Sequence, residues 1–279
     1  MATPVLEKFT LSGALGEIFV DVRATDRRAP LPAVIILHGF KGFKDWGMFP
    51  PLAERLARAG FAAISLNVSG SGVDDAGLPA WPDRFSRNTF SAEQADLDRL
   101  LDDLDAGRLG LPRPTSVGIV GHSRGGGMAV LFAGRVPRVG ALVTWAAISH
   151  VRRWQPAQME SWRRAGRLDV VNTRTGQIQS LLPDVLDDIE AHADGALDIP
   201  AAAGRIAAPW LVIHGSADEA VPFAEADRLA AAARPGVVDR LTLPGAGHTF
   251  GAMHPFAGMN PDLERVFDRT IAHFGRALR

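Results

Sequence analysis

Short, continuous apolar runs recur along the chain between longer segments of mixed polarity. The run "AVIILHG" at 33–39 is rich in β-branched residues, which is typical of a strand that is buried on both faces. Five later segments have a related pattern. Together they predict buried strands at 33–39, 61–70, 116–121, 139–147, 209–215 and 238–245.

The first 30 residues have a different pattern. The segments "KFTLSG" and "GEIFVDVRA" alternate apolar and polar positions around a turn that contains glycine. This period of two predicts an antiparallel β-hairpin at the start of the chain.

The clearest helical pattern covers residues 91–106. Its apolar positions fall at intervals of three and four residues, as on one face of a helix, and they are Leu97, Leu100, Leu101 and Leu104. Ser91 and Gln94 have the spacing of a capping box at its start. Further helices are expected at 50–60, from Arg124 through Phe132, at 223–233 and at 262–278.

Strands that alternate with helices imply βαβ crossovers and a mostly parallel sheet with helices on both faces. We expect the 279 residues to form a single α/β domain. The segment 149–205 interrupts the alternation, because it is rich in Trp and Arg and then in Asp and Ala, without a strong strand pattern. We interpret it as a small helical cap inserted over the edge of the sheet, with an ordinary long crossover as the alternative.

Composition narrows the class of protein. Thirty Lys and Arg balance 31 Asp and Glu, so the chain offers no support for nucleic-acid binding. Because there is no cysteine, disulfides, thiolate catalysis and thiolate metal sites are excluded. The N-terminus lacks the pattern of a secretory signal, and no apolar run is long enough to span a membrane. We therefore expect a soluble cytoplasmic protein.

The sequence Gly121-His122-Ser123-Arg124-Gly125 joins a predicted strand to a predicted helix. This Gly-x-Ser-x-Gly pattern is weak by itself, but a strand-to-helix turn is the setting in which such a serine acts as a nucleophile. The glycines permit a tight turn, and the start of the helix offers free N–H groups to a developing oxyanion. The alternative is a serine that only forms part of a turn.

A nucleophilic serine needs a base and a group that orients the base. Asp218 follows the predicted strand at 209–215, and His248 follows the strand at 238–245, so both belong at the same sheet edge as Ser123. We expect His248 to accept the serine proton and Asp218 to orient His248. Glu219 and His254 are the alternatives for the acid and the base.

Four motifs, "LHGF", "GHSRG", "HGSADEAVP" and "GAGH", appear in this order. Together they resemble the α/β-hydrolase fold, and in particular its dienelactone-hydrolase-like and prolyl-oligopeptidase-like serine hydrolases. The resemblance covers nearly the whole chain apart from 149–205. It implies an oxyanion hole formed by the backbone N–H groups of Phe40 and Arg124. Dienelactone hydrolases themselves use a cysteine, which this chain lacks, so the resemblance implies a related ester or peptide hydrolase.

Several other residues are candidates for the substrate pocket. We name His122, Trp154 and His254 as pocket residues, although His122 is also expected to pack beneath the turn. Lys41 and Lys44 are expected to be solvated loop lysines, with contact to an anionic substrate as the alternative. No group of histidines and carboxylates has metal-ligand spacing, so neither a metal nor another cofactor is expected.

The sequence therefore predicts a serine hydrolase that cleaves a carboxylic ester through an acyl-enzyme. Its partners would be a small acyl substrate and water, while the sequence does not specify an oligomeric state. A peptidase, an amidase or an acyltransferase with the same triad is the main alternative. A non-catalytic binding protein is a further alternative, which the presence of Ser123, Asp218 and His248 disfavours.

Overall fold

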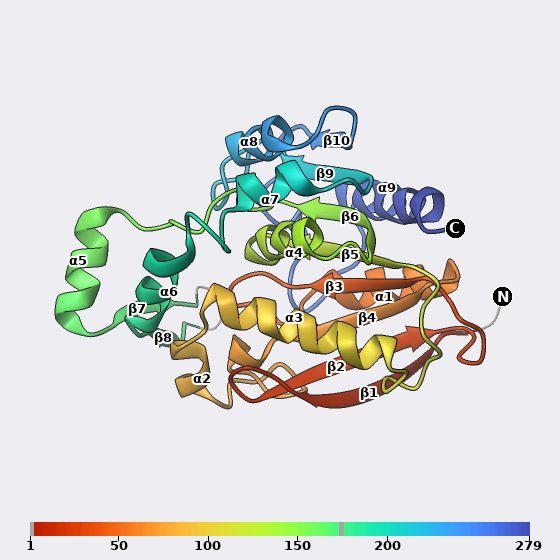
Figure 1. The fold of residues 1–279 in the computed structure, drawn as a ribbon, viewed down its shortest axis with the longest axis horizontal. Helices are drawn as coiled ribbons and strands as arrows, with labels where there is room; N and C mark the ends of the chain where they lie inside the picture. The colour runs from red at the N-terminus through yellow and green to blue at the C-terminus, as the bar shows by residue number, and fades with distance from the viewer. Residues whose placement is uncertain (1–2, 173–175) are drawn as a thin grey trace.

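The computed structural model describes residues 3–172 and 176–279 (Figure 1). Its main sheet has eight strands in the order β1-β2-β4-β3-β5-β6-β9-β10. The pairs β1–β2 and β2–β4 are antiparallel, whereas all the other pairs are parallel. The strands are β1 (Val5–Ser12), β2 (Glu17–Ala24), β3 (Ala33–Leu37), β4 (Ala62–Asn67), β5 (Val117–His122), β6 (Val139–Trp145), β9 (Trp210–Gly215) and β10 (Val238–Leu243). The predicted hairpin and mostly parallel sheet are confirmed.

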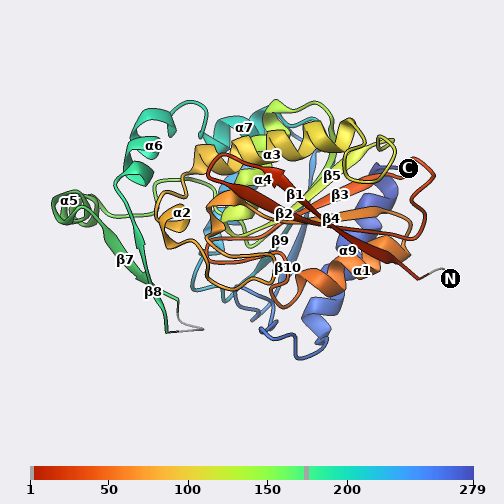
Figure 2. The same ribbon diagram turned by 90° about the horizontal axis from the view of Figure 1, so that it is seen from below.

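Helices cover both faces of this sheet, as Figure 2 shows from below. One apolar layer lies beneath α1 (Phe49–Arg58) and α9 (Pro261–Ala277). The opposite layer is larger, and its helices are α3 (Phe90–Asp105), α4 (Arg124–Arg135), α7 (Ile199–Arg205) and α8 (Ala224–Ala232). The central strands β3, β4, β5 and β9 are buried along their whole length, which explains their continuous apolar sequences.

Helix α3 begins differently from the prediction. Its N-cap is Thr89, whose side chain accepts a hydrogen bond from the Ala92 N–H. The predicted capping box is wrong, because both of its side chains make tertiary contacts instead. Ser91 donates its hydroxyl hydrogen bond to Asp188, and Gln94 donates from Nε2 to the Met128 carbonyl at 3.0 Å.

Between β6 and β9 the chain leaves the sheet and returns. It forms α5 (Pro156–Ala165), β7 (Leu168–Val171), β8 (Ile178–Leu181), α6 (Asp184–His192) and α7. The first four elements project beyond the end of the main sheet, at the left of Figure 1. The helical interpretation of 149–205 did not predict the antiparallel β7–β8 hairpin that the structure contains. Its strands have four residues each, which is too short for an alternating apolar pattern to stand out in the sequence.

The short elements η1 (Ser69–Ser71) and α2 (Pro82–Ser86) connect β4 to α3. Within the ranges that the structure describes, no helix is long and apolar enough to cross a bilayer.

Candidate active site

Ser123 occupies the turn between β5 and α4. Its backbone has φ 57° and ψ −121°, which lies outside the regions that residues other than glycine commonly adopt. Hydrogen bonds hold it there: its N–H donates to the Trp145 carbonyl at 2.8 Å, and its carbonyl accepts from Gly126 at 3.0 Å and from Ile148 at 3.2 Å. Such strain persists where neighbouring structure fixes the backbone, and it is concentrated at functional sites.

The glycines on either side of Ser123 are required by close backbone packing. A Cβ atom added to Gly121 would lie 2.2 Å from the Gly125 carbonyl oxygen. A Cβ atom added to Gly125 would lie 2.2 Å from the carbonyl oxygen of His38, at the end of β3. The Gly-x-Ser-x-Gly pattern therefore reflects direct contact of the turn with itself and with the neighbouring strand.

The structure brings His248 and Asp218 together at the same edge of the sheet. His248 Nδ1 lies 2.8 Å from Asp218 Oδ2, and the Asp218 side chain is fully buried. The other carboxylate oxygen accepts hydrogen bonds from the N–H groups of Ala220 and Val221, both at 2.9 Å. Glu219, the alternative acid, is exposed.

A second histidine also contacts the Asp218 carboxylate. His214 is buried in β9, and its Nε2 lies 2.9 Å from the Val221 carbonyl and 3.3 Å from Asp218 Oδ2. Burial alone would raise the pKa of Asp218, but hydrogen bonds from His214, His248 and the Val221 N–H outweigh that effect. They hold the pKa well below its usual range, so the carboxylate stays ionised beside His248.

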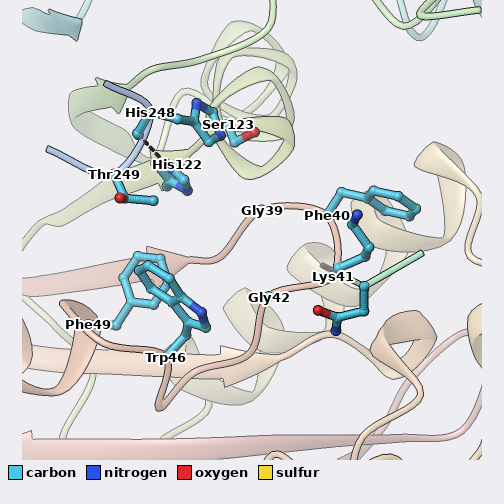
Figure 3. Close-up of a pocket in the computed structure, with 11 residues that line it drawn as sticks. Gly39, Phe40, Lys41, Gly42, Trp46, Phe49, His122, Ser123, His248 and Thr249 are labelled. Atoms are coloured by element: carbon cyan, nitrogen blue, oxygen red, sulfur yellow. Dashed lines mark hydrogen bonds between the residues drawn. The ribbon is translucent and has the colours of Figure 1, made fainter. Parts of the chain in front are cut away.

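His122 fixes the backbone that carries His248. The two rings lie 4.6 Å apart between centroids, and His122 Nε2 lies 3.0 Å from the His248 carbonyl (dashed line in Figure 3). Burial lowers the pKa of His122 to about 3, so the ring is neutral and its Nε2–H donates to that carbonyl. Its edge packs on Phe49. His122 thus combines the expected packing role with a place in the cavity wall.

Two cavities meet at Ser123. We call the first the His248 cavity; it has a volume of about 260 Å³. It is lined by Gly39, Phe40, Lys41, Gly42, Trp46, Phe49, His122, Ser123, Asn172, His248 and Thr249. Figure 3 shows Ser123, His122 and His248 on one side of it, opposite the loop that carries Phe40 and Lys41.

We call the second the apolar cavity; it has a volume of about 220 Å³. It is lined by Phe40, Phe90, Ser123, Arg124, Ile148, Arg153, Trp154, Ala220 and Val221. Phe90, Ile148 and Val221 were not predicted from the sequence as site residues. Ile148 follows the predicted strand at 139–147, so its place at a strand end was the available signal.

The two residues predicted as oxyanion donors lie beside Ser123. Phe40 borders both cavities, and Arg124 is the first residue of α4, where helix N–H groups have no intrahelical acceptor. The Arg124 side chain is buried, with Nε 2.8 Å from Glu93 Oε1 and a hydrogen bond of 2.9 Å to the Asn88 carbonyl. Its guanidinium also lies 3.9 Å from the centre of the Phe90 ring. Its charge is therefore engaged inside the protein, which leaves the backbone N–H for the site.

The other predicted pocket residues differ in position. Trp154 lines the apolar cavity. His254 is not among the described residues that line either cavity. Its Nδ1 accepts a hydrogen bond from the Gly47 N–H at 3.1 Å, and its ring packs against those of Phe43 and Trp46. His254 thus supports the His248 cavity through Trp46.

The two loop lysines have different environments. Lys41 lines the His248 cavity and donates from Nζ to the Val171 carbonyl of β7 at 3.0 Å. The prediction of a solvated lysine is wrong for Lys44, whose side chain is fully buried. Its Nζ lies 3.0 Å from Asp21, 2.5 Å from Asp45 and 3.2 Å from Asp75. Asp21 is itself buried, because β2 lies inside the sheet.

Neither a metal site nor a complete Ser–His contact is present in the described residues. No group of three or more histidines and carboxylates in residues 3–172 and 176–279 could hold a metal ion. Within the same ranges, no hydrogen bond joins the Ser123 hydroxyl to His248, although both residues line one cavity. Catalytic hydrogen bonds of this kind commonly tighten when substrate binds.

The chain is similar to several proteins of known sequence or structure. A curated relative, 2,6-dihydropseudooxynicotine hydrolase of Paenarthrobacter nicotinovorans, is 25% identical over 211 residues, which are 75% of this chain and 50% of that protein. The chain therefore spans about half the length of this relative. Est1E from Butyrivibrio proteoclasticus is 17% identical with a TM-score of 0.70, and the match covers 97% of this chain and 98% of that one. A putative hydrolase from Agrobacterium vitis S4 is 18% identical with a TM-score of 0.76, covering 96% and 99%.

The structural likenesses extend over nearly the whole chain and are evidence of a shared fold. The family model described as the alpha/beta hydrolase fold matches residues 32–197. This range contains Phe40 and Ser123 and ends before Asp218 and His248. Since the model matches more than half of the 279 residues, the chain belongs to the α/β-hydrolase fold family.

Proposed function

We propose that the protein is a serine hydrolase that cleaves carboxylic esters through an acyl-enzyme. One observation carries the proposal: the strained Ser123 shares a cavity with His248, whose ring is hydrogen-bonded to the buried Asp218. A nucleophile beside a base, with the base held by a carboxylate, is the arrangement that acyl transfer requires. The segment 149–205 would act as a cap that forms part of the substrate-binding wall.

The first half-reaction forms the acyl-enzyme. Ser123 Oγ attacks the ester carbonyl carbon while His248 Nε2 accepts the hydroxyl proton, and the carbonyl π electrons move onto oxygen. The N–H groups of Phe40 and Arg124 would stabilise that oxyanion. When the oxyanion collapses, the bond to the alcohol oxygen breaks and His248 donates its proton to the leaving alkoxide.

The second half-reaction releases the acid. Water attacks the acyl carbon, His248 accepts a proton from it, and a second oxyanion forms in the same hole. Its collapse breaks the bond to Ser123 Oγ, which regains the proton from His248. Asp218 remains ionised throughout, because its role is to orient His248 and to stabilise the imidazolium form. The scheme needs a small acyl substrate and water, and no cofactor.

The decisive experiment compares the wild type with Ser123→Ala on p-nitrophenyl acetate. We expect kcat to fall by about 10³-fold or more, because the nucleophile is lost. A fluorophosphonate should label the wild type at Ser123, as peptide mass spectrometry would identify, and should leave the variant unlabelled. Equal, low rates for the two proteins would refute the proposal and favour a binding protein.

The related activities are separated by their acceptors and scissile bonds. Aminoacyl anilides cleaved faster than matched esters would indicate a peptidase or an amidase. Ester formation with an added alcohol, at the expense of the free acid, would indicate an acyltransferase. Ester hydrolysis that exceeds both reactions is the result we expect.

A further inference from the structure

The division of the site into two cavities carries information about the substrate. Among the described lining residues, the two cavities share Phe40 and Ser123, which are the proposed oxyanion donor and the nucleophile. The carbonyl carbon under attack must lie beside both of these residues. The reacting carbon therefore belongs at the junction of the cavities, with one half of the ester in each.

The position of the base decides which half occupies which cavity. His248 must donate a proton to the oxygen of the leaving alcohol, so that oxygen has to lie on the His248 side of the carbonyl carbon. His248 and Thr249 line the first cavity, whereas neither is among the described residues that line the apolar cavity, which include Ile148 and Trp154. Resting on the proposed function, we infer that the alcohol occupies the His248 cavity and the acyl group occupies the apolar cavity.

The walls of the apolar cavity define the acyl class. Phe90, Ile148 and Val221 are buried side chains without charge. The two arginines at its border are already paired: Arg124 with Glu93 at 2.8 Å, and Arg153 Nη1 with Glu225 at 2.7 Å. Unpaired charge is thus absent from the described part of this wall, and an uncharged apolar acyl group matches it.

Volume sets the size of that group. An apolar cavity of about 150 Å³ is large enough for benzene, and this cavity has a volume of about 220 Å³. It can enclose one aromatic ring or a short alkyl chain, but not a long fatty-acyl chain. The substrate class is therefore an ester of a compact apolar acid, such as a benzoate or a butanoate.

Two residues on different walls of the apolar cavity determine the preferred size of the acyl group. Ile148 is fixed near the nucleophile, because its N–H donates to the Ser123 carbonyl at 3.2 Å. Trp154 belongs to the segment that precedes α5, and its ring packs edge-on against Trp162 at 5.2 Å between centroids. Trp162 is buried and donates from Nε1 to the Leu181 carbonyl of β8 at 2.8 Å. The cap thus holds one wall of the acyl site, while the sheet edge holds the other.

The test uses two series of esters. The acyl series combines p-nitrophenol with acetyl, butanoyl, benzoyl and dodecanoyl groups. The alcohol series combines butanoate with methyl, phenyl and naphthyl groups. Values of kcat/KM are measured for the wild type, Ile148→Phe and Trp154→Ala, with Trp46→Leu as the matched variant in the His248 cavity.

We expect the wild type to prefer butanoyl or benzoyl to dodecanoyl. Ile148→Phe should lower the benzoyl-to-acetyl ratio by about tenfold, and Trp154→Ala should raise the dodecanoyl-to-butanoyl ratio by a similar factor. Both variants should preserve the order of the alcohol series, which Trp46→Leu should change. Because the two acyl-site changes act in opposite directions, general loss of structure cannot imitate them. If Ile148→Phe does not fold, Trp154→Ala and Trp46→Leu still decide the assignment.

Three results would overturn the inference. They are a wild-type preference for dodecanoyl esters, an unchanged acyl series in Trp154→Ala, and an alcohol series that responds to Ile148→Phe or Trp154→Ala instead of Trp46→Leu. Failure of the proposed function has a different signature, since it would give ester hydrolysis that does not depend on Ser123.

Discussion

The turn after β5 and the segment that carries α5 both border the apolar cavity, but they are built differently. Every residue of β5 is buried, and so are the first nine residues of α4. In α5, by contrast, Trp162 is the one buried residue of ten. Ser123 thus rests on the core of the protein, whereas α5 contributes one buried residue to the packing of the opposing wall.

The attachments of this wall can be named. One is the buried Trp162. Another is Asp188 of α6, which accepts hydrogen bonds from the N–H groups of Phe90 and Ser91 at the start of α3. Lys41 binds the Val171 carbonyl of β7.

Helix α6 is attached more firmly, because Val185, Leu186 and Ile189 belong to the apolar core. Helix α5, with one buried residue, is the element for which we expect local opening without global unfolding. We therefore expect that the proposed chemistry and the proposed substrate preference can change separately.

The largest effect is expected where the buried carboxylate meets the base. Asp218→Asn should lower kcat for p-nitrophenyl acetate by about 10⁴-fold, because an amide does not stabilise the required tautomer and the imidazolium form of His248. Glu219→Gln is the matched control at the neighbouring exposed position, and its kcat should change by less than about twofold. A large effect of Glu219→Gln with a small effect of Asp218→Asn would mean that Glu219, and not Asp218, orients His248.

The loop lysines offer a comparison of stability between the two regions. Lys44→Met should lower the free energy of unfolding by about 3–5 kcal/mol, because it leaves Asp21 buried with reduced charge compensation. Lys41→Met should lower it by about 1 kcal/mol, since one hydrogen bond to β7 is lost. Urea denaturation measures both values. Adding Asp21→Asn to Lys44→Met should recover part of the loss, and additive losses would contradict the proposed pairing.

Two buried histidines predict how stability depends on pH. Burial lowers the pKa of His38 to about 4 and that of His122 to about 3. An unfolded histidine has a pKa of about 6.5, so the unfolded chain binds more protons below that pH and stability falls on acidification. Each group should contribute a loss of roughly 2 kcal/mol between pH 8 and pH 5.

Denaturation of His38→Asn at the two pH values tests this expectation. The variant should lose less stability than the wild type between pH 8 and pH 5, whatever its stability at pH 8. His192→Gln, at an exposed position of α6, is the control and should retain the wild-type difference. A wild-type difference retained by His38→Asn would contradict the assignment.

The smallest effect on activity is expected where α5 is attached to β8. Trp162→Phe removes the donor to the Leu181 carbonyl, which should destabilise the α5–β8 contact by about 1–3 kcal/mol. Because that contact lies outside the main sheet, we expect a shift in the benzoyl-to-acetyl ratio of a few fold and nearly unchanged acetyl hydrolysis. Hydrogen exchange should increase in β7 and β8 and stay constant in β5. Equal increases in all three strands would mean that the cap and the core unfold together.

The features that the sequence predicted correctly are those that depend on one local rule. Short continuous apolar runs identified the central strands, because strands buried on both faces are typically rich in Val, Ile and Leu. The ends of parallel strands share one sheet edge, and this rule is what placed Asp218 and His248 beside Ser123 as candidates. Each of these features depends on a short segment and on topology.

Features that depend on contacts between distant segments were not predictable. Lys44 has the sequence context of a loop lysine, and its burial follows from packing under β2 beside Asp21. Ser91 and Gln94 have capping-box spacing, yet Asp188 and Met128 compete for their side chains. The strands of the β7–β8 hairpin have four residues each, and the apolar face formed by Leu168, Val170 and Leu181 is too short to mark them as strands in the sequence.

Gly39 has a consequence for how the site can evolve. A Cβ atom added there would lie 2.9 Å from Ser123 Cβ and 3.0 Å from the His122 carbonyl oxygen. The loop that carries Phe40 therefore rests directly on the turn that carries the nucleophile. We expect any larger residue at this position to separate Phe40 from Ser123 and so to disturb the proposed alignment of the oxyanion donor with the attacking oxygen. We expect new substrate preferences to arise more readily through Trp154 and α5, where substitutions would leave the proposed alignment unchanged.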